Sequence, residues 1–277
     1  MASPGEHDHA SDTVAASLDF FVNTGEKPVT YAPEPGAGPT QRTGSFRRHA
    51  VGIRDGRPLV DRLALDQEGF LLTRHVTLVS DFYDEEEVRA VYHPELENLV
   101  KEATGATKVV VFDTTLRTDD PARREEKNVR EPVRLAHNDY TERSGPQRVR
   151  DLLPHEAEAL LERRFAIINV WRSIRGPVES MPLAVCDARS IAAGDLIAAE
   201  RRTRDRVGEV QHLLFNPDQR WFYFPHMRQN EALVIKCYDS ATDGRARFAA
   251  HAAFDHPTTS PDARPRESIE ARSFVFF

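Results

Sequence analysis

From about residue 165 to its end, the chain is a series of short apolar or alternating segments with turn residues between most of them. Such segments are typical of β-strands, and no regular helical crossovers separate them. The pattern therefore predicts a β-rich fold of the antiparallel sandwich or jelly-roll kind rather than a doubly wound parallel sheet. The segments are FAIINVW, MPLAVC, EVQHLLF, RWFYFP, ALVIKCY, RFAAHAAF and SIEARSFVFF.

Helical periodicity is limited to a few segments. Residues 93–105 carry apolar side chains at helical spacing, with Pro94 in the first turn and Gly105 just past the end. These signals predict a surface helix packed against a sheet. A buried strand is expected directly after it, over Lys108–Asp113. Two further segments compatible with a helix are residues 154–164 and 190–202.

The N-terminal region differs in character from the rest. It is polar and includes a stretch rich in Pro, Gly and Ser, so we expect an extended or partly disordered arm over residues 1–45. Residues 46–277 are then expected to form a single domain. His7 and His9 in the arm imitate a metal motif, but a loose terminus does not hold ligands in a fixed geometry.

Composition restricts the partners. A net charge of -7 argues against nucleic acid, which needs Lys and Arg concentrated on one face. The absence of a signal-peptide pattern and of an apolar stretch near ~20 residues predicts a soluble, cytoplasmic protein with no membrane partner. Cys186 and Cys237 are expected to pack as small apolar side chains. A small-molecule substrate remains, and the oligomeric state stays open, with a homodimer as one option.

His137 and Asp139 stand two positions apart in an otherwise polar, extended segment, so their side chains point to the same side. Two histidines and one carboxylate form the metal site of non-haem iron(II) oxygenases. We expect His251, which has small alanines on both sides, to be the third ligand, with His226 and then His212 as alternatives. The competing interpretation is a hydrogen-bonded turn at His137 and a packed core histidine at His251.

Downstream of His251, Arg266 and Ser268 alternate on one face of the last expected strand. An arginine binds a carboxylate through two parallel hydrogen bonds, and a hydroxyl adds a third, which fits the far carboxylate of 2-oxoglutarate. Arg272 lies on the same face and is the alternative clamp or a substrate-binding residue.

Three other side chains are candidates for the same cavity. Trp171 and Arg172 are neighbours, so in a regular strand only one of them faces the cavity. Arg172 would suit an acidic substrate or the co-substrate, and an exposed or ion-paired arginine is the alternative. Tyr223 could donate a hydrogen bond to the co-substrate, although core packing is the commoner role of such a residue.

Together, His137-x-Asp139, the distal His251 and Arg266-x-Ser268 resemble the iron(II)/2-oxoglutarate-dependent oxygenase superfamily. From about residue 30 onward the chain is similar to the hydroxylase/desaturase family typified by AsaB and CmcJ, which recurs in natural-product pathways. The segments that carry this similarity are GFLLTRH, HNDYT, NVWRSIRGPVESMPLAVCD, RWFYFPHM, KCYDS and PRESIEARSFVF.

The resemblance implies a double-stranded β-helix core with flanking helices, and Fe(II), 2-oxoglutarate and O2 as cofactors. It also implies hydroxylation, desaturation or oxidative cyclisation of a small metabolite, and the surplus arginines suggest an anionic one. Two alternatives stay open: a metal-dependent enzyme that does not use 2-oxoglutarate, and a non-catalytic jelly-roll binding protein. Succinate formation tests the first alternative, and metal content tests the second.

Overall fold

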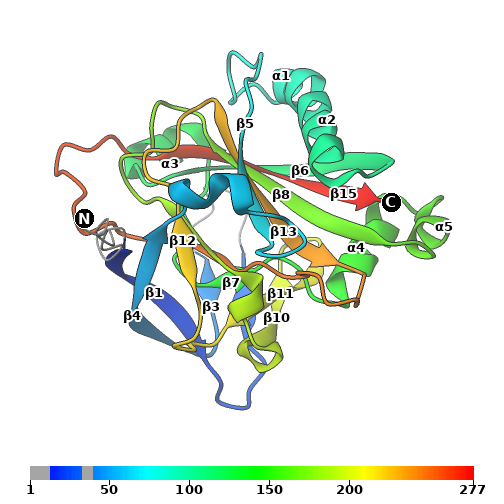
Figure 1. Ribbon diagram of the computed structural model, residues 1–277, viewed down its shortest axis with the longest axis horizontal. Coiled ribbons are helices and arrows are strands. Elements are labelled where there is room, and N and C mark those ends of the chain that lie inside the picture. The colour runs from blue at the N-terminus through cyan, green and yellow to red at the C-terminus, as the bar shows by residue number, and fades with distance from the viewer. Residues whose placement is uncertain (1–12, 33–39) are drawn as a thin grey trace, which may run out of the picture.

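Two facing β-sheets form the body of the molecule, as the computed structural model shows for residues 13–32 and 40–277 (Figure 1). The predicted β-rich class is confirmed. One sheet has ten strands in the order β1-β4-β12-β9-β14-β7-β11-β10-β2-β3, and the other has five in the order β5-β13-β8-β15-β6. The strands are β1 (Thr13–Val22), β2 (Val29–Tyr31), β3 (Gln41–Arg42), β4 (Ser45–Asp55), β5 (Phe70–Arg74), β6 (Lys108–Thr118), β7 (His137–Asn138), β8 (Phe165–Ser173), β9 (Leu183–Cys186), β10 (Leu196–Arg202), β11 (Val207–Leu213), β12 (Trp221–Tyr223), β13 (Glu231–Asp239), β14 (His251–Ala253) and β15 (Glu267–Phe276).

The helices are short, and α2 is the longest of them. It covers the outer face of the five-stranded sheet beside β6 (Figure 1), and Gly105 ends it in the left-handed conformation with φ 71°. The helix predicted at residues 93–105 is thus confirmed. No described helix is long and apolar enough to cross a membrane. The helical segments are η2 (Arg57–Arg62), α1 (Glu85–Glu87), the π-helix η3 (Val88–Tyr92), α2 (His93–Thr104), α3 (Pro121–Lys127), α4 (Ser144–Leu152), α5 (Ala157–Leu161), η4 (Ala188–Ser190) and η5 (Ala193–Asp195).

Three groups of apolar side chains hold these layers together. The first lies between the sheets and includes Trp171 and Phe222, and the second joins α2 to the outer face of the five-stranded sheet. The third includes Trp221 and lies where the ten-stranded sheet curls over itself, because Asp19 of β1 forms a parallel bridge with Leu135 just before β7. Of these three groups, the first is therefore the one to which the inner faces of both sheets contribute side chains.

One segment adopts a different secondary structure from the one expected. Residues 190–202 form η5 and β10 rather than a helix, because β10 pairs along its whole length with β11 and also with β2. Part of the arm expected to be extended or partly disordered forms β1, an extended strand that pairs with β4 from Thr13 to Val22. Tertiary pairing overrides local propensity at residues 190–202. His7 and His9 lie outside the described residues.

The strand predicted at Lys108–Asp113 is real but continues to Thr118. The whole of this strand pairs with β15. Its second half carries polar side chains into the space between the sheets. Both cysteines are buried and free, as expected. The expected helix at residues 154–164 is reduced to the five residues of α5.

Candidate metal centre

The sheets bring together three side chains that the sequence singled out. His137 lies on β7 and is paired directly with His251 on β14, and Asp139 follows β7 by one residue. One ligand atom from each of the three lies within 4.8 Å of the others. His137 Nε2 is 3.6 Å from Asp139 Oδ1, and the imidazole centroids are 4.6 Å apart. Direct cross-strand pairing is what lets a residue far along the chain join the His-x-Asp pair.

Backbone carbonyls orient both imidazoles. The Nδ1 atoms of His137 and His251 lie 2.8 Å and 3.4 Å from the carbonyl oxygens of Leu135 and Ala249. If each Nδ1 donates to its carbonyl, each Nε2 keeps a free lone pair for a metal. Burial, with the nearby His251, lowers the pKa of His137 to about 3, so this imidazole is neutral, as a ligand must be.

The carboxylate of Asp139 is held by two donors from the opposite sheet. Its Oδ2 atom accepts hydrogen bonds from Asn169 Nδ2 at 2.7 Å and from Arg272 Nε at 2.8 Å. Burial alone would raise the pKa of Asp139, but the Arg272 guanidinium holds it well below its usual range. Because Oδ2 is occupied, Oδ1 is the oxygen that faces the histidines.

Arg272 uses four of its five N–H donors within the protein. Beyond Asp139, it donates to Asp113 Oδ2 at 2.7 Å, to Thr115 Oγ1 at 3.0 Å and to Glu270. The sequence left Arg272 as a clamp or substrate residue, and its contacts instead make it part of the support of Asp139. Sequence reasoning assigned no role to Asn169, although its alternation with Trp171 on β8 could have placed it on the cavity face.

The residues present fit a ferrous ion. Two imidazoles and one carboxylate that converge on one point are the ligand set of a facial iron(II) site, which leaves the remaining positions open. The second oxygen of Asp139 is engaged by protein donors, so the carboxylate offers a single oxygen to the metal.

Arg266 and Ser268 lie on the same inner face of the five-stranded sheet and are almost completely buried. Arg266 Nη1 donates to the carbonyl of Met181 at 2.5 Å, and its guanidinium lies 5.4 Å from the centroid of Trp171. Within the described part of the chain, Arg266 Nε and Ser268 Oγ have no hydrogen-bond partner. Unsatisfied buried donors are expensive, so this pair is suited to an anionic ligand.

Two other sequence candidates lie away from the three ligands. Arg172 points to the outer side of its sheet, where its Nη2 lies 2.8 Å from the carbonyl of His75 and its guanidinium lies over Tyr92. Tyr223 pairs with Ala184 on β9, whereas His251 pairs with the next residue, Val185, so the two side chains point to opposite faces of the sheet. The Tyr223 hydroxyl lies 3.1 Å from His256 Nε2. Neither side chain reaches the space between the sheets at the metal site.

The alternative third ligands are not in the group either. His212 pairs with His137 across β11 and β7, but its ring lies 5.8 Å from those of Phe21 and Phe46, and its Nδ1 has no partner among the described residues. His226 follows β12 in a loop, with φ 48°. His137 therefore pairs with a histidine on each side, and His251 is the one whose ring lies 4.6 Å from the ring of His137 and whose ligand atom joins the group.

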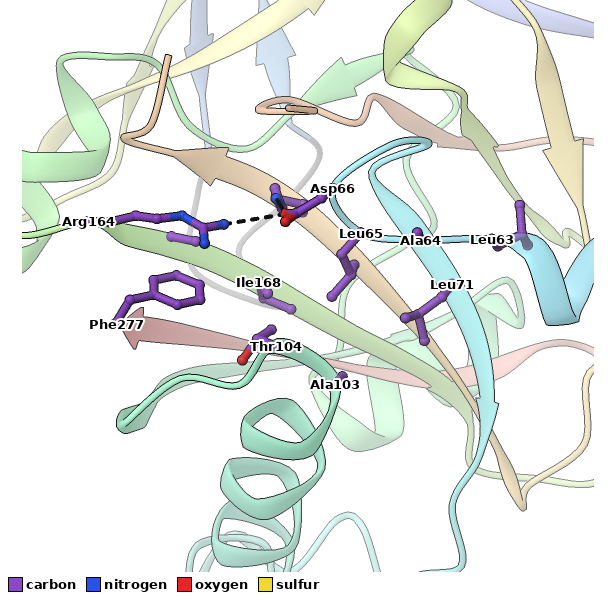
Figure 2. A pocket seen from close by; sticks show the side chains of 12 residues that line it. Leu63, Ala64, Leu65, Asp66, Leu71, Ala103, Thr104, Arg164, Ile168 and Phe277 are labelled. Carbon is purple, nitrogen blue, oxygen red and sulfur yellow. Dashed lines mark hydrogen bonds and ion pairs between the residues drawn. The ribbon is translucent and has the colours of Figure 1, made fainter. Parts of the chain in front are cut away.

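A separate cavity of about 260 Å³ lies behind the five-stranded sheet (Figure 2). Ile168 and Phe277 form part of its wall, and Arg164 points at Asp66 across it. Its buried cation, Lys236, is already paired with Asp66 and Asp239 at 2.5 and 2.9 Å. The cavity offers no unpaired charge and no group of metal ligands among the residues that line it, so it does not compete with the site between the sheets.

Comparisons with known proteins agree with this geometry. Residues 18–276 match the family model described as "Oxidoreductase/YMDC permease-like domain". The chain is 34% identical over 254 residues to the Fe(II)/2-oxoglutarate-dependent dioxygenase nvfI of Aspergillus novofumigatus, covering 89% of this chain and 90% of nvfI. It is 30% identical over 290 residues to the hydroxylase/desaturase efuI of Hormonema carpetanum, covering 96% of each. A solved structure of the iron- and alpha-ketoglutarate-dependent endoperoxidase NvfI superposes with a TM-score of 0.84 at 30% identity, covering 96% of this chain and 99% of that one.

Proposed function

Because the chain belongs to the family of iron(II)/2-oxoglutarate-dependent oxygenases that includes the hydroxylase/desaturases, we propose that His137, Asp139 and His251 hold its iron. The enzyme uses Fe(II), 2-oxoglutarate and O2. Its relatives favour this function over a metal enzyme without 2-oxoglutarate and over a non-catalytic binding protein. We also propose that residues 46–277 form one oxygenase domain, to which β1 to β3 add strands.

The strand order supports a double-stranded β-helix as the core of that domain. The strands β6-β15-β8-β13 would form one half, and β7-β14-β9-β12 would form the other. In this arrangement the iron ligands come from one sheet and the co-substrate clamp from the other. The remaining strands would extend the edges of these halves.

One observation carries the assignment of the co-substrate site. On the inner face of β8, Asn169 contacts Asp139, and Trp171, two residues further, lies under Arg266. Residues two apart on a strand are separated by about 7 Å, which is comparable to the length of 2-oxoglutarate. We assign Arg266 and Ser268 to the far carboxylate, since both have buried donors without acceptors among the described residues.

The protein residues then have distinct tasks. Asn169 and Arg272 fix the orientation of Asp139, and Arg266 and Ser268 fix the end of the co-substrate far from the metal. Bound iron(II) would activate O2 against a substrate C–H bond, and 2-oxoglutarate would supply two electrons to O2 as it is oxidised to succinate and carbon dioxide. The apolar walls between the sheets keep water away from the reacting atoms.

The relatives suggest the class of reaction. They include dioxygenases, hydroxylase/desaturases, an endoperoxidase and a protein of Aspergillus oryzae named for aspirochlorine biosynthesis. We propose that this enzyme hydroxylates, desaturates or oxidatively cyclises a small metabolite of a natural-product pathway. The two free buried cysteines suit the reducing cytoplasm, where we place it.

Visible absorption under anaerobic conditions tests the assignment. Iron(II) and then 2-oxoglutarate are added to the purified protein, and a metal-to-ligand charge-transfer band is expected. At a moderate concentration of 2-oxoglutarate, Arg266→Ala should lose the band. The matched control is Arg264→Ala, two residues away, whose arginine is half-exposed and paired with Glu179, and which should keep it. A band of normal strength in Arg266→Ala refutes the clamp, and no band in the unaltered protein refutes the proposed function.

A further inference from the structure

Arg117 is a cation on the cavity face of β6 that no carboxylate neutralises within the described residues. It pairs with Ser268 across the strands, so it lies on the same face as Ser268 and Arg266. Its Nη1 donates to the backbone carbonyl of Glu131 at 2.7 Å, and this is its one side-chain hydrogen bond among the described residues. The remaining guanidinium donors are available to a ligand.

Arg130 lies beside it. A parallel bridge joins Arg130 to Arg117, so the two guanidinium groups leave the backbone from neighbouring segments. The next residue, Glu131, forms an ion pair with Arg124 instead, with 3.0 Å between Arg124 Nη1 and Glu131 Oε2. Arg130 is half-buried and forms no ion pair with any residue in the ranges 13–32 and 40–277.

A third cation of this kind approaches from the opposite sheet. On β10, Ile197 pairs with His212, and His212 pairs with His137, so these side chains share the inner face. Arg201 lies four residues beyond Ile197 and therefore points to that face too. It is half-buried and has no side-chain hydrogen-bond or ion-pair partner in the part of the chain that the structure describes.

Arg117 lies two residues beyond Thr115 on β6, and Thr115 accepts a hydrogen bond from Arg272, which supports Asp139. Burial and the charges of Arg272 and Arg130 lower the pKa of Arg201 to about 10. Burial likewise lowers the pKa of Arg117, against the opposing effect of Glu270. Glu270 does not cancel this charge, because four guanidinium groups, counting Arg272, face only three carboxylates, those of Asp139, Asp113 and Glu270. An excess of positive charge therefore remains beside the metal site.

The strand order separates Arg201 from the co-substrate clamp, whereas Arg117 is the cross-strand neighbour of Ser268 and lies beside it. Within the ten-stranded sheet, β14 lies on one side of β7, and β10 lies two strands away on the other side. Two strand spacings are about 10 Å, which leaves room for the carbon skeleton of a small molecule between Arg201 and the iron ligands. A group bound by Arg201 would thus be part of the substrate and not of the co-substrate.

We propose that Arg117, Arg130 and Arg201 bind an oxyanion of the organic substrate, a carboxylate, sulfate or phosphate group held away from the carbon that reacts. This inference rests on the proposed function, because it takes the space beside Asp139 as the substrate site. Arginine is suited to the task, since its planar group donates paired hydrogen bonds to such oxyanions. The enzyme then selects acidic metabolites over their neutral esters and amides.

Binding of a matched pair of probes tests the inference. Naphthalene-2-sulfonate and neutral naphthalene-2-sulfonamide are titrated calorimetrically into the protein loaded with iron(II) and 2-oxoglutarate without oxygen. The sulfonate should bind and the sulfonamide should bind at least about tenfold more weakly, as expected for the loss of charge-assisted hydrogen bonds. Equal binding of the two probes, or no binding of the sulfonate, overturns the inference.

Variants locate the binding groups. Arg201→Gln and Arg117→Gln should each weaken sulfonate binding about tenfold, and Arg201→Lys should retain part of it. The control is Arg204→Gln in the turn after β10, whose arginine is 83% exposed and 3.9 Å from Asp205. The charge-transfer band of each variant reports whether the iron and 2-oxoglutarate sites are intact. Unchanged sulfonate binding in variants that keep the band refutes this inference alone, whereas loss of the band in the unaltered protein refutes the proposed function.

Discussion

The segment of residues 266–272, which includes the first part of β15, carries an arginine on the cavity face at each end, and the two arginines are in opposite states. At its start, Arg266 and Ser268 are buried and have donors without acceptors among the described residues. Further along, Arg272 donates to Asp139, Asp113 and Glu270. Side-chain donors that are paired within the protein hold the metal ligand Asp139 in place, whereas buried donors without a partner are suited to bind a small molecule.

Removal of an iron ligand has the largest expected effect, because Arg272 supports a ligand of this metal and Arg266 is assigned to the co-substrate that binds to it. In His251→Ala, iron(II) affinity should fall by more than the ~100-fold that loss of a supporting residue can cause. Metal analysis of protein reconstituted with iron(II) measures it. His256→Ala is the control, since His256 contacts Tyr223 outside the site. Retention of one iron per chain in His251→Ala would remove this histidine from the ligand set.

Arg272 and Arg266 should differ most clearly in what they contribute to the free energy of unfolding. Arg272→Met should destabilise the metal-free protein by about 3–5 kcal/mol, because it leaves buried carboxylates without their cation. Arg266→Met should change stability little or increase it, because it removes a buried charge that lacks a carboxylate partner and loses one hydrogen bond, to the Met181 carbonyl. Urea denaturation of both variants gives the two free energies of unfolding. Equal losses would show that the two ends do not differ.

The pH dependence of that loss should be specific to Arg272. With Arg272 present, the folded pKa of Asp139 lies below its unfolded value of ~3.9, so the pair adds stability above this pH and loses it as pH falls. Without Arg272, burial raises the pKa of Asp139, and protonation removes the unpaired buried charge. The stability difference between the unaltered protein and Arg272→Met should therefore be largest near neutral pH and shrink below about pH 5.

Urea curves at several pH values measure this effect, with Arg266→Met as the control. The hydrogen bond from the Arg266 side chain goes to a backbone carbonyl, so its variant should show no comparable trend. A stability difference for Arg272→Met that is constant from about pH 7 to about pH 4 would contradict the role of Asp139 in the loss.

Ser268→Ala is expected to have the smallest effect. Its Oγ has no partner among the described residues, so the substitution should leave the free energy of unfolding nearly unchanged. It should weaken 2-oxoglutarate binding by about 1 kcal/mol, the net contribution of one hydrogen bond. Titration of the charge-transfer band with 2-oxoglutarate measures this. Ser273→Ala is the comparison, since Ser273 donates to the Ile168 carbonyl and its loss should affect stability instead.

Local signals predicted those parts of the fold that local interactions control. The helix α2 agrees with expectation because Pro94 and Gly105 act within a turn of its ends. The alanine-rich residues 190–202 were expected to be helical, and pairing with β11 and β2 made most of them β-strand. That error also concealed Arg201, whose orientation toward the cavity depends on the strand.

The same division applies to the site. The spacing of His137 and Asp139, and the alternation of Arg266 with Ser268, could be read directly from the chain. The support of Asp139 could not, since its partners Asn169 and Arg272 are 30 and 133 residues away. Ser268, two residues after Arg266, favoured Arg266 as the clamp, but no local signal showed that Arg272 is held by acidic partners.

By itself the sequence determined the β-rich class, the types of side chain available for a metal and an anion, and the faces on which alternating residues fall. The tertiary structure alone decided which arginine is neutralised, which histidine stands opposite His137 and which cations meet beside Asp139. The physical reason is that alternation and helix capping act between near neighbours. Burial, charge pairing and hydrogen-bond satisfaction depend instead on strands that pair across long stretches of the chain.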